Sequence, residues 1–115
     1  MKSIVVANWK MNPASFKEAK ALFEATKKVA EKCPNISLIV APPTLYLHEL
    51  ASNYRGKRIS FAIQNAHAEA SGAYTGETSI AQARDAGADY VLIGHSERRA
   101  MGETNDDTRK KTAAA

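Results

Sequence analysis

Four short apolar segments recur along this chain, and each is followed by residues with the apolar spacing of an α-helix. The segments cover residues 4–7, 36–41, 59–64 and 90–93. They lack a regular alternation of apolar and polar residues, which is typical of strands in a parallel sheet covered on both faces. Strands and helices alternate without a linker or a low-complexity stretch. The sequence therefore predicts an α/β fold built on one parallel sheet.

Local signals place the ends of the predicted helices. Ser15 and Glu18 have the spacing of a capping box, so a helix is expected to begin at residue 16 and to stop before Pro34. Further helices are expected over residues 44–53 and 79–87, and from residues 96 and 104 onward. The buried face of the first helix is expected to comprise Phe16, Ala19, Leu22, Phe23, Thr26, Val29 and Ala30.

Polar side chains follow the first and the fourth predicted strands. Asn8 and Lys10 come directly after the first strand, and His95, Ser96 and Glu97 come directly after the fourth. The carboxyl ends of parallel strands meet at one edge of a sheet, where α/β folds build their active sites. A lysine, a neutral histidine donor and an asparagine amide suit the stabilisation of negative charge on a small, oxygen-rich substrate.

Four segments together resemble the triosephosphate isomerase family. They are Asn-Trp-Lys-Met-Asn at residues 8–12, Ala-Pro-Pro at 41–43, Gly-Ala-Tyr-Thr-Gly-Glu at 72–77 and Gly-His-Ser-Glu-Arg-Arg at 94–99. The resemblance covers the whole chain in the right order. It implies the N-terminal (βα)4 half of a (β/α)8 barrel, because such a barrel needs about 250 residues. Residues 1–115 are thus expected to form a single half-barrel unit whose fourth helix is truncated.

The resemblance also implies roles for the polar residues. His95 is the neutral electrophile that donates to the substrate carbonyl, and a helix starting at Ser96 would aim amide donors at its imidazole. Lys10 stabilises the developing negative charge and binds the substrate phosphate, and Asn8 orients Lys10 or donates to the substrate oxygen. Glu97 positions Lys10. Alternatively, Glu97 is a surface carboxylate paired with one of the two following arginines, and Asn8 is an ordinary turn residue.

A long segment between the third strand and the next helix has a separate implied role. In the family the loop matching residues 66–77 protrudes into a neighbouring subunit. Thr75, Gly76 and Glu77 are therefore candidate subunit contacts, and a dimer is expected once the barrel is complete. The alternative is an ordinary solvent loop, in which Gly72 and Gly76 merely permit tight turns.

The family's catalytic glutamate, its mobile lid and its phosphate-binding amides all lie in the second half of the barrel. The leading hypothesis is therefore the N-terminal half of a split triosephosphate isomerase, inactive alone and completed by a C-terminal half-barrel chain. Together the halves would interconvert dihydroxyacetone phosphate and glyceraldehyde 3-phosphate through an enediolate. The alternatives are a non-catalytic half-barrel that self-associates through its open edges and, less favoured, a phosphate-binding or regulatory module.

Composition limits the other possibilities. The net charge is +4, but the basic residues are interleaved with acidic ones or, as at residues 109–111, lie late in a helix on an expected solvated surface. Nucleic-acid binding is therefore not expected. The lone Cys33 favours a reducing, cytoplasmic location, and residues 4–7 are too short to enter a membrane. His48 and His67 are interpreted as incidental, and the sequence implies neither a metal nor a cofactor.

Overall fold

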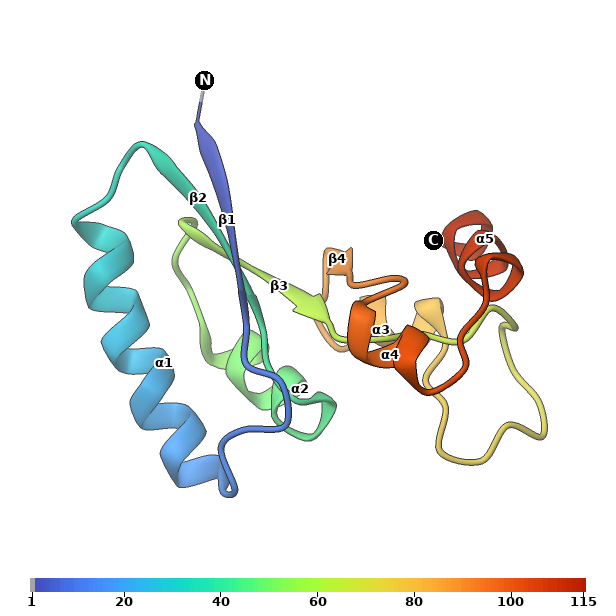
Figure 1. Ribbon diagram of the computed structural model, residues 1–115. Helices are drawn as coiled ribbons and strands as arrows, with labels where there is room; N and C mark the ends of the chain where they lie inside the picture. Colours follow the sequence, from blue (N-terminus) through green and yellow to red (C-terminus); the bar gives the residue numbers. More distant parts are fainter. Residues whose placement is uncertain (1) are drawn as a thin grey trace.

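The computed structural model describes residues 2–115, and the predicted alternation of strands and helices is confirmed. One four-stranded sheet has the order β1-β2-β3-β4, and Figure 1 shows the chain wound along it from the N-terminus to the C-terminus. The elements are β1 (Ser3–Asn8), α1 (Phe16–Glu31), β2 (Ile36–Ala41), α2 (Thr44–Asn53), β3 (Ile59–Ile63), α3 (Ile80–Asp85), β4 (Tyr90–Val91), α4 (Ser96–Ala100) and α5 (Asn105–Ala114). This is the arrangement of an N-terminal half-barrel.

The register of the parallel strands decides which side chains share a face of the sheet. Val5, Leu38 and Ile59 lie side by side on neighbouring strands, as do Val6, Ile39 and Ser60 on the opposite face. The first face carries the helices, because Leu38 packs with Phe23 of α1 and Leu47 of α2 in one apolar cluster. Asn8 aligns with Ala41 on the second face, which is the inner face of a half-barrel.

The core lies between the first face of the sheet and the helices α1 to α3. Its centre is aromatic, since the ring of Phe23 lies 5.3 Å from that of Phe61 and 5.5 Å from that of Tyr54. Leu47 and Ile63 are buried around them. A core of this kind fixes the sheet against its helices and so holds the strand ends in place.

The covering of the sheet is incomplete along β1. Ile4, Val5 and Val6 remain 65%, 43% and 47% exposed, as expected for the free edge of a half-barrel. The predicted buried face of α1 is correct for Ala19, Phe23 and Ala30 but wrong for two positions. Leu22 is 44% and Val29 is 61% exposed, because no described element covers that flank of the helix.

The fourth strand is shorter than predicted. Regular pairing ends at Val91 rather than at residue 93, although the amide of Leu92 still donates to the carbonyl of Ile63. The chain then turns at Gly94, whose φ of +69° lies in the left-handed region that favours glycine. This early turn directs the next residue, His95, into the start of α4.

Candidate active site

The backbone of Lys10 adopts an unusual conformation just beyond β1. Its φ of +58° is in the left-handed region, which is uncommon for a residue with a side chain. Two contacts hold it there: the Lys10 amide donates to Asn8 Oδ1 at 2.9 Å, and Gln64 Nε2 donates to the Lys10 carbonyl at 2.8 Å. Residues held in such conformations cluster at functional sites.

An ion pair joins the end of β1 to α4. Lys10 Nζ lies 2.9 Å from Glu97 Oε1, and both side chains are 56% exposed. The hydrogen bond from Lys10, together with its charge, holds the pKa of the Glu97 carboxyl below its ordinary value. Pairing of Glu97 with Arg98 or Arg99 is wrong, since Arg98 faces Glu103 and Arg99 donates to neutral oxygens.

His95 is the residue that caps the N-terminus of α4. Its Nδ1 accepts a hydrogen bond from the Glu97 amide at 3.1 Å, and the side chain is 31% exposed. Because a neutral imidazole with Nδ1 as acceptor carries its proton on Nε2, the free edge of the ring is a hydrogen-bond donor. Ser96 occupies the first position of α4 and is exposed.

Glu97 lies close to both Lys10 and His95. Its Oε1 lies 2.9 Å from Lys10 Nζ and 3.6 Å from His95 Nδ1, although Lys10 and His95 are separated by most of the chain. The result is a cation and a neutral donor held at the carboxyl edge of the sheet, beside the amide of Asn8. Such a group can stabilise an oxyanion as it forms.

Comparison with known proteins shows the family to which the chain belongs. The family model described as triosephosphate isomerase matches residues 3–115. The chain belongs to the triosephosphate isomerase family. Triosephosphate isomerases similar to it include those of Coprinopsis cinerea (48% identical over 112 residues), Endomicrobium trichonymphae (41% over 115) and Lactiplantibacillus plantarum (43% over 112). These matches cover 96%, 99% and 96% of the chain.

The same matches cover only part of each triosephosphate isomerase. They account for 44%, 46% and 44% of the relatives' own lengths, so the chain spans about half the length of the curated relatives it matches. The four strands of the described fold agree with that share. The part of the family's fold that this chain contains is therefore an N-terminal half-barrel.

The 66–77 loop is exposed around the candidate contact residues. Thr75, Gly76 and Glu77 all lie on its exposed part, and Figure 1 shows the loop extending away from the sheet. Its two ends are tied together where the amide of His67 donates to the carbonyl of Thr78 at 2.7 Å. The loop is thus a closed protrusion, which leaves its tip free to meet another surface.

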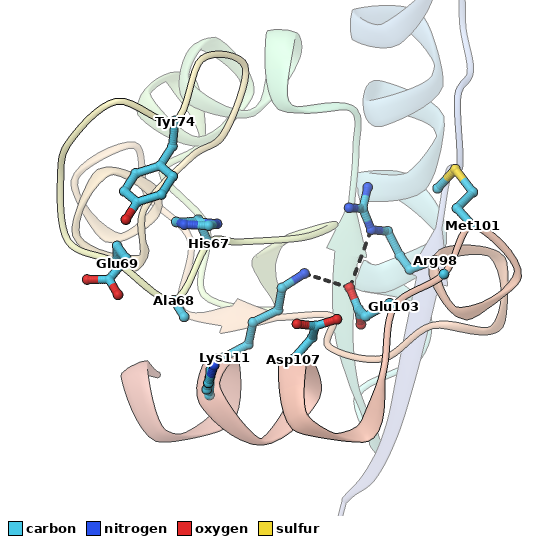
Figure 2. A pocket seen from close by; sticks show the side chains of 11 residues that line it. His67, Ala68, Glu69, Tyr74, Arg98, Met101, Glu103, Asp107 and Lys111 are labelled. Atoms are coloured by element: carbon cyan, nitrogen blue, oxygen red, sulfur yellow. Dashed lines mark hydrogen bonds and ion pairs between the residues drawn. The ribbon is translucent and has the colours of Figure 1, made fainter.

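Sequence reasoning missed three polar residues near this edge: Gln64, Arg99 and Lys111. Lys111 was expected on a solvated surface but is 8% exposed. Its Nζ donates to Glu103 Oε2 at 2.6 Å and to Asn65 Oδ1 at 2.8 Å. Figure 2 shows this pair in the wall of a cavity of about 430 Å³ between the 66–77 loop and α5. Helical spacing alone does not signal such a contact, because it depends on the loop after β3.

The Lys111–Glu103 pair leads to a stability prediction. We expect Glu103→Gln to lower the free energy of unfolding by about 3 kcal/mol at neutral pH, because a buried ammonium loses its counter-charge. The hydrogen bond from Lys111 lowers the pKa of Glu103 below its ordinary 4.5. The stabilisation is therefore complete above that pH and is lost as the pH falls through the lower folded-state pKa. Urea unfolding followed by circular dichroism at several pH values measures both effects.

The matched control is Asp106→Asn. Asp106 pairs with Arg109 and Lys110 on the exposed side of α5, where its side chain is 56% exposed. We expect no resolvable change in the unfolding midpoint at neutral pH, because water screens such pairs. Equal midpoints for Glu103→Gln and the unaltered chain would contradict the stabilising role of the buried pair.

Two further features of the described residues concern metal ions and membranes. Between residues 2 and 115, no group of three or more histidine, cysteine, aspartate or glutamate side chains is placed to bind a metal ion. No helix in the same part of the chain is both long and apolar enough to cross a membrane.

Proposed function

We propose that this chain supplies the electrophilic half of a triosephosphate isomerase active site. The observation that carries the proposal is the Glu97 carboxylate, which lies between the Lys10 ammonium and the His95 imidazole at one edge of the sheet. The proposed reaction interconverts dihydroxyacetone phosphate and glyceraldehyde 3-phosphate. It requires no cofactor.

Each proposed role follows from the chemistry of the residue. A base removes a proton from the carbon next to the substrate carbonyl, and the carbon–hydrogen electron pair forms the double bond of an enediolate. The carbonyl electrons move onto oxygen, where His95 Nε2–H and the Lys10 ammonium stabilise the charge. The hydroxyl proton then passes from its own oxygen to the former carbonyl oxygen, and the base returns its proton to the neighbouring carbon as the enediolate double bond becomes the new carbonyl, which gives the isomer. Asn8 holds the Lys10 backbone through its 2.9 Å contact.

The base is proposed to come from four further βα units, which also bring the lid and the phosphate-binding amides. Glu97 is a poor candidate for that base, because its carboxylate is already paired with Lys10 and its pKa is lowered. The exposed apolar residues of β1 give the missing units a surface to cover. We therefore propose a C-terminal half-barrel as the partner of this half.

The test is an isomerase assay on the completed barrel. The chain is mixed with, or joined to, the C-terminal βα units of the Coprinopsis cinerea relative, and conversion of glyceraldehyde 3-phosphate is followed in a coupled assay. The proposal expects activity that depends on both halves. A folded assembly of both halves without isomerase activity would overturn it.

The exposed edge of β1 favours a second candidate, a non-catalytic half-barrel that self-associates. Ile4, Val5 and Val6 are exposed, and unpaired apolar edges attract further chains. Native mass spectrometry separates the two candidates. Only multiples of 12.5 kDa in the presence of the C-terminal units would favour self-association, whereas a mixed complex favours the split enzyme.

The 66–77 loop is proposed to join two completed barrels. We expect Thr75→Arg to weaken the dimer of barrels by about 10²-fold, because it places an unpaired charge in the proposed contact. Sedimentation equilibrium measures the dissociation constant. Ser52→Arg, at an exposed position on α2, is the control and leaves the constant unchanged. An unaltered dimer in Thr75→Arg contradicts the proposed contact.

A further inference from the structure

The guanidinium of Arg99 links the turn after β4 to α5 beside the candidate site. Its Nε donates to the Gly94 carbonyl at 3.1 Å, its Nη1 to Asn105 Oδ1 at 2.7 Å and its Nη2 to Thr108 Oγ1 at 3.3 Å. These acceptors lie just beyond β4, at the start of α5 and one turn further along α5. A planar group with several fixed donors is suited to such a junction.

The first of these acceptors is next to His95 in the chain. Gly94 has a φ of +69°, and a Cβ added there would lie 3.1 Å from Thr108 Cγ2 and 3.2 Å from Arg99 Nη2. The turn that leads into His95 is therefore packed tightly against both partners. A shift of the Gly94 peptide changes where the next residue begins α4, and His95 is the cap of that helix.

The neighbouring arginine makes a different set of contacts. Arg98 Nε lies 3.6 Å from the carboxylate of Glu103, whose side chain is 5% exposed. Arg99 donates instead to a backbone carbonyl, an amide oxygen and a hydroxyl, all of them neutral. Its contacts therefore depend on the direction of its donors more than on its charge.

We propose that Arg99 is a positioning residue, which holds the Gly94 peptide against α5 and so fixes the orientation and tautomer of the His95 imidazole. The effect of Arg99 on catalysis rests on the proposed function. Its effect on structure does not, because it concerns only the hydrogen bond from the Glu97 amide to His95 Nδ1 at 3.1 Å. Loss of the Arg99 contacts frees the turn, and this hydrogen bond weakens.

The first readout needs no catalysis. The ¹⁵N-labelled 115-residue chain is examined by long-range ¹H–¹⁵N correlation at a pH where the histidines are neutral, and His95→Gln identifies the His95 signals. In the unaltered chain we expect one dominant tautomer with the proton on Nε2. In Arg99→Met the difference between the two ring nitrogen shifts falls about twofold, toward the averaged values of the exposed His48.

Two variants separate positioning from charge and from general stability. Arg109→Met removes the same group from α5, where Arg109 is 71% exposed and contacts Asp106, and it leaves the His95 shifts unchanged. Arg99→Lys keeps the charge but cannot reach three acceptors, so it restores at most part of the tautomer preference. Full restoration by lysine, or averaged His95 tautomers in the unaltered chain, would overturn the proposal.

The second readout uses the completed barrel. We expect Arg99→Met to lower kcat about 10- to 10²-fold, because a small displacement of a catalytic group is enough to do so, while KM changes little. An altered His95 tautomer without any isomerase activity in the unaltered assembly would leave the positioning role standing and remove the proposed function. Unchanged tautomer and kcat in Arg99→Met overturn the positioning role alone.

Discussion

The completed isomerase is expected to lose about 10²- to 10³-fold in kcat when His95 is replaced by alanine. The reason is the Nε2–H donor, which the Glu97 amide keeps in place by donating to Nδ1 at 3.1 Å. Alanine leaves the forming oxyanion with Lys10 as its remaining partner from this half of the barrel. Steady-state kinetics in both reaction directions measure the change.

A control variant and an unfolding measurement distinguish loss of the His95 donor from loss of the folded structure. His48→Ala removes an exposed histidine on α2 and is expected to leave kcat unchanged. KM for His95→Ala should change far less than kcat, because the proposed contact strengthens as charge develops in the transition state. A loss of kcat below tenfold, in a variant that unfolds at the same urea concentration as the unaltered assembly, contradicts the electrophilic role.

The 115-residue chain by itself is expected to show no isomerase activity above background. A general base contributes about 10²- to 10⁴-fold, and the loss of a closing lid removes more. Glu97 cannot take over, because its carboxylate lies 2.9 Å from Lys10 Nζ and its pKa is lowered by that contact. The measurement is a coupled assay at high protein concentration, with chain prepared from a host that lacks its own isomerase.

A matched variant shows whether any residual signal belongs to the chain. Activity from the chain must fall in His95→Ala, whereas activity from a contaminating isomerase does not. A rate that is well above background and sensitive to this substitution would contradict the prediction. It would mean that a base exists within the half-barrel or within an assembly of its copies.

Local signals along the chain predicted the architecture well. The Ser15 cap of the first helix and the parallel strand patterns depend on residues close together in sequence, and the fold shows both, with Ser15 Oγ accepting from the Glu18 amide at 3.2 Å. The proximity of Lys10 and Glu97 was also predictable, because the carboxyl ends of parallel strands meet at one edge. The choice of Lys10 over the two following arginines as the partner of Glu97 came only from the family resemblance, and the 2.9 Å ion pair agrees with it.

Contacts between distant loops were not predictable in the same way. Gln64 reaches the carbonyl of Lys10, and Lys111 reaches Asn65, only after the turn beyond β3 has taken its shape. The exposure of Leu22 and Val29 was missed for another reason. Helical spacing shows which residues share a face, but it does not show whether another element is present to cover that face.

The left-handed backbone conformation of Lys10 is set without any contact from a partner or ligand. Asn8 and Gln64 hold that conformation with hydrogen bonds made entirely inside the N-terminal half. The unfavourable torsion is therefore present without any contact from outside these residues, and substrate binding in the proposed assembly need not induce it. A site prepared in this way loses less conformational entropy when it closes on its ligand. The proposed assembly would therefore receive Lys10 with its backbone conformation already set.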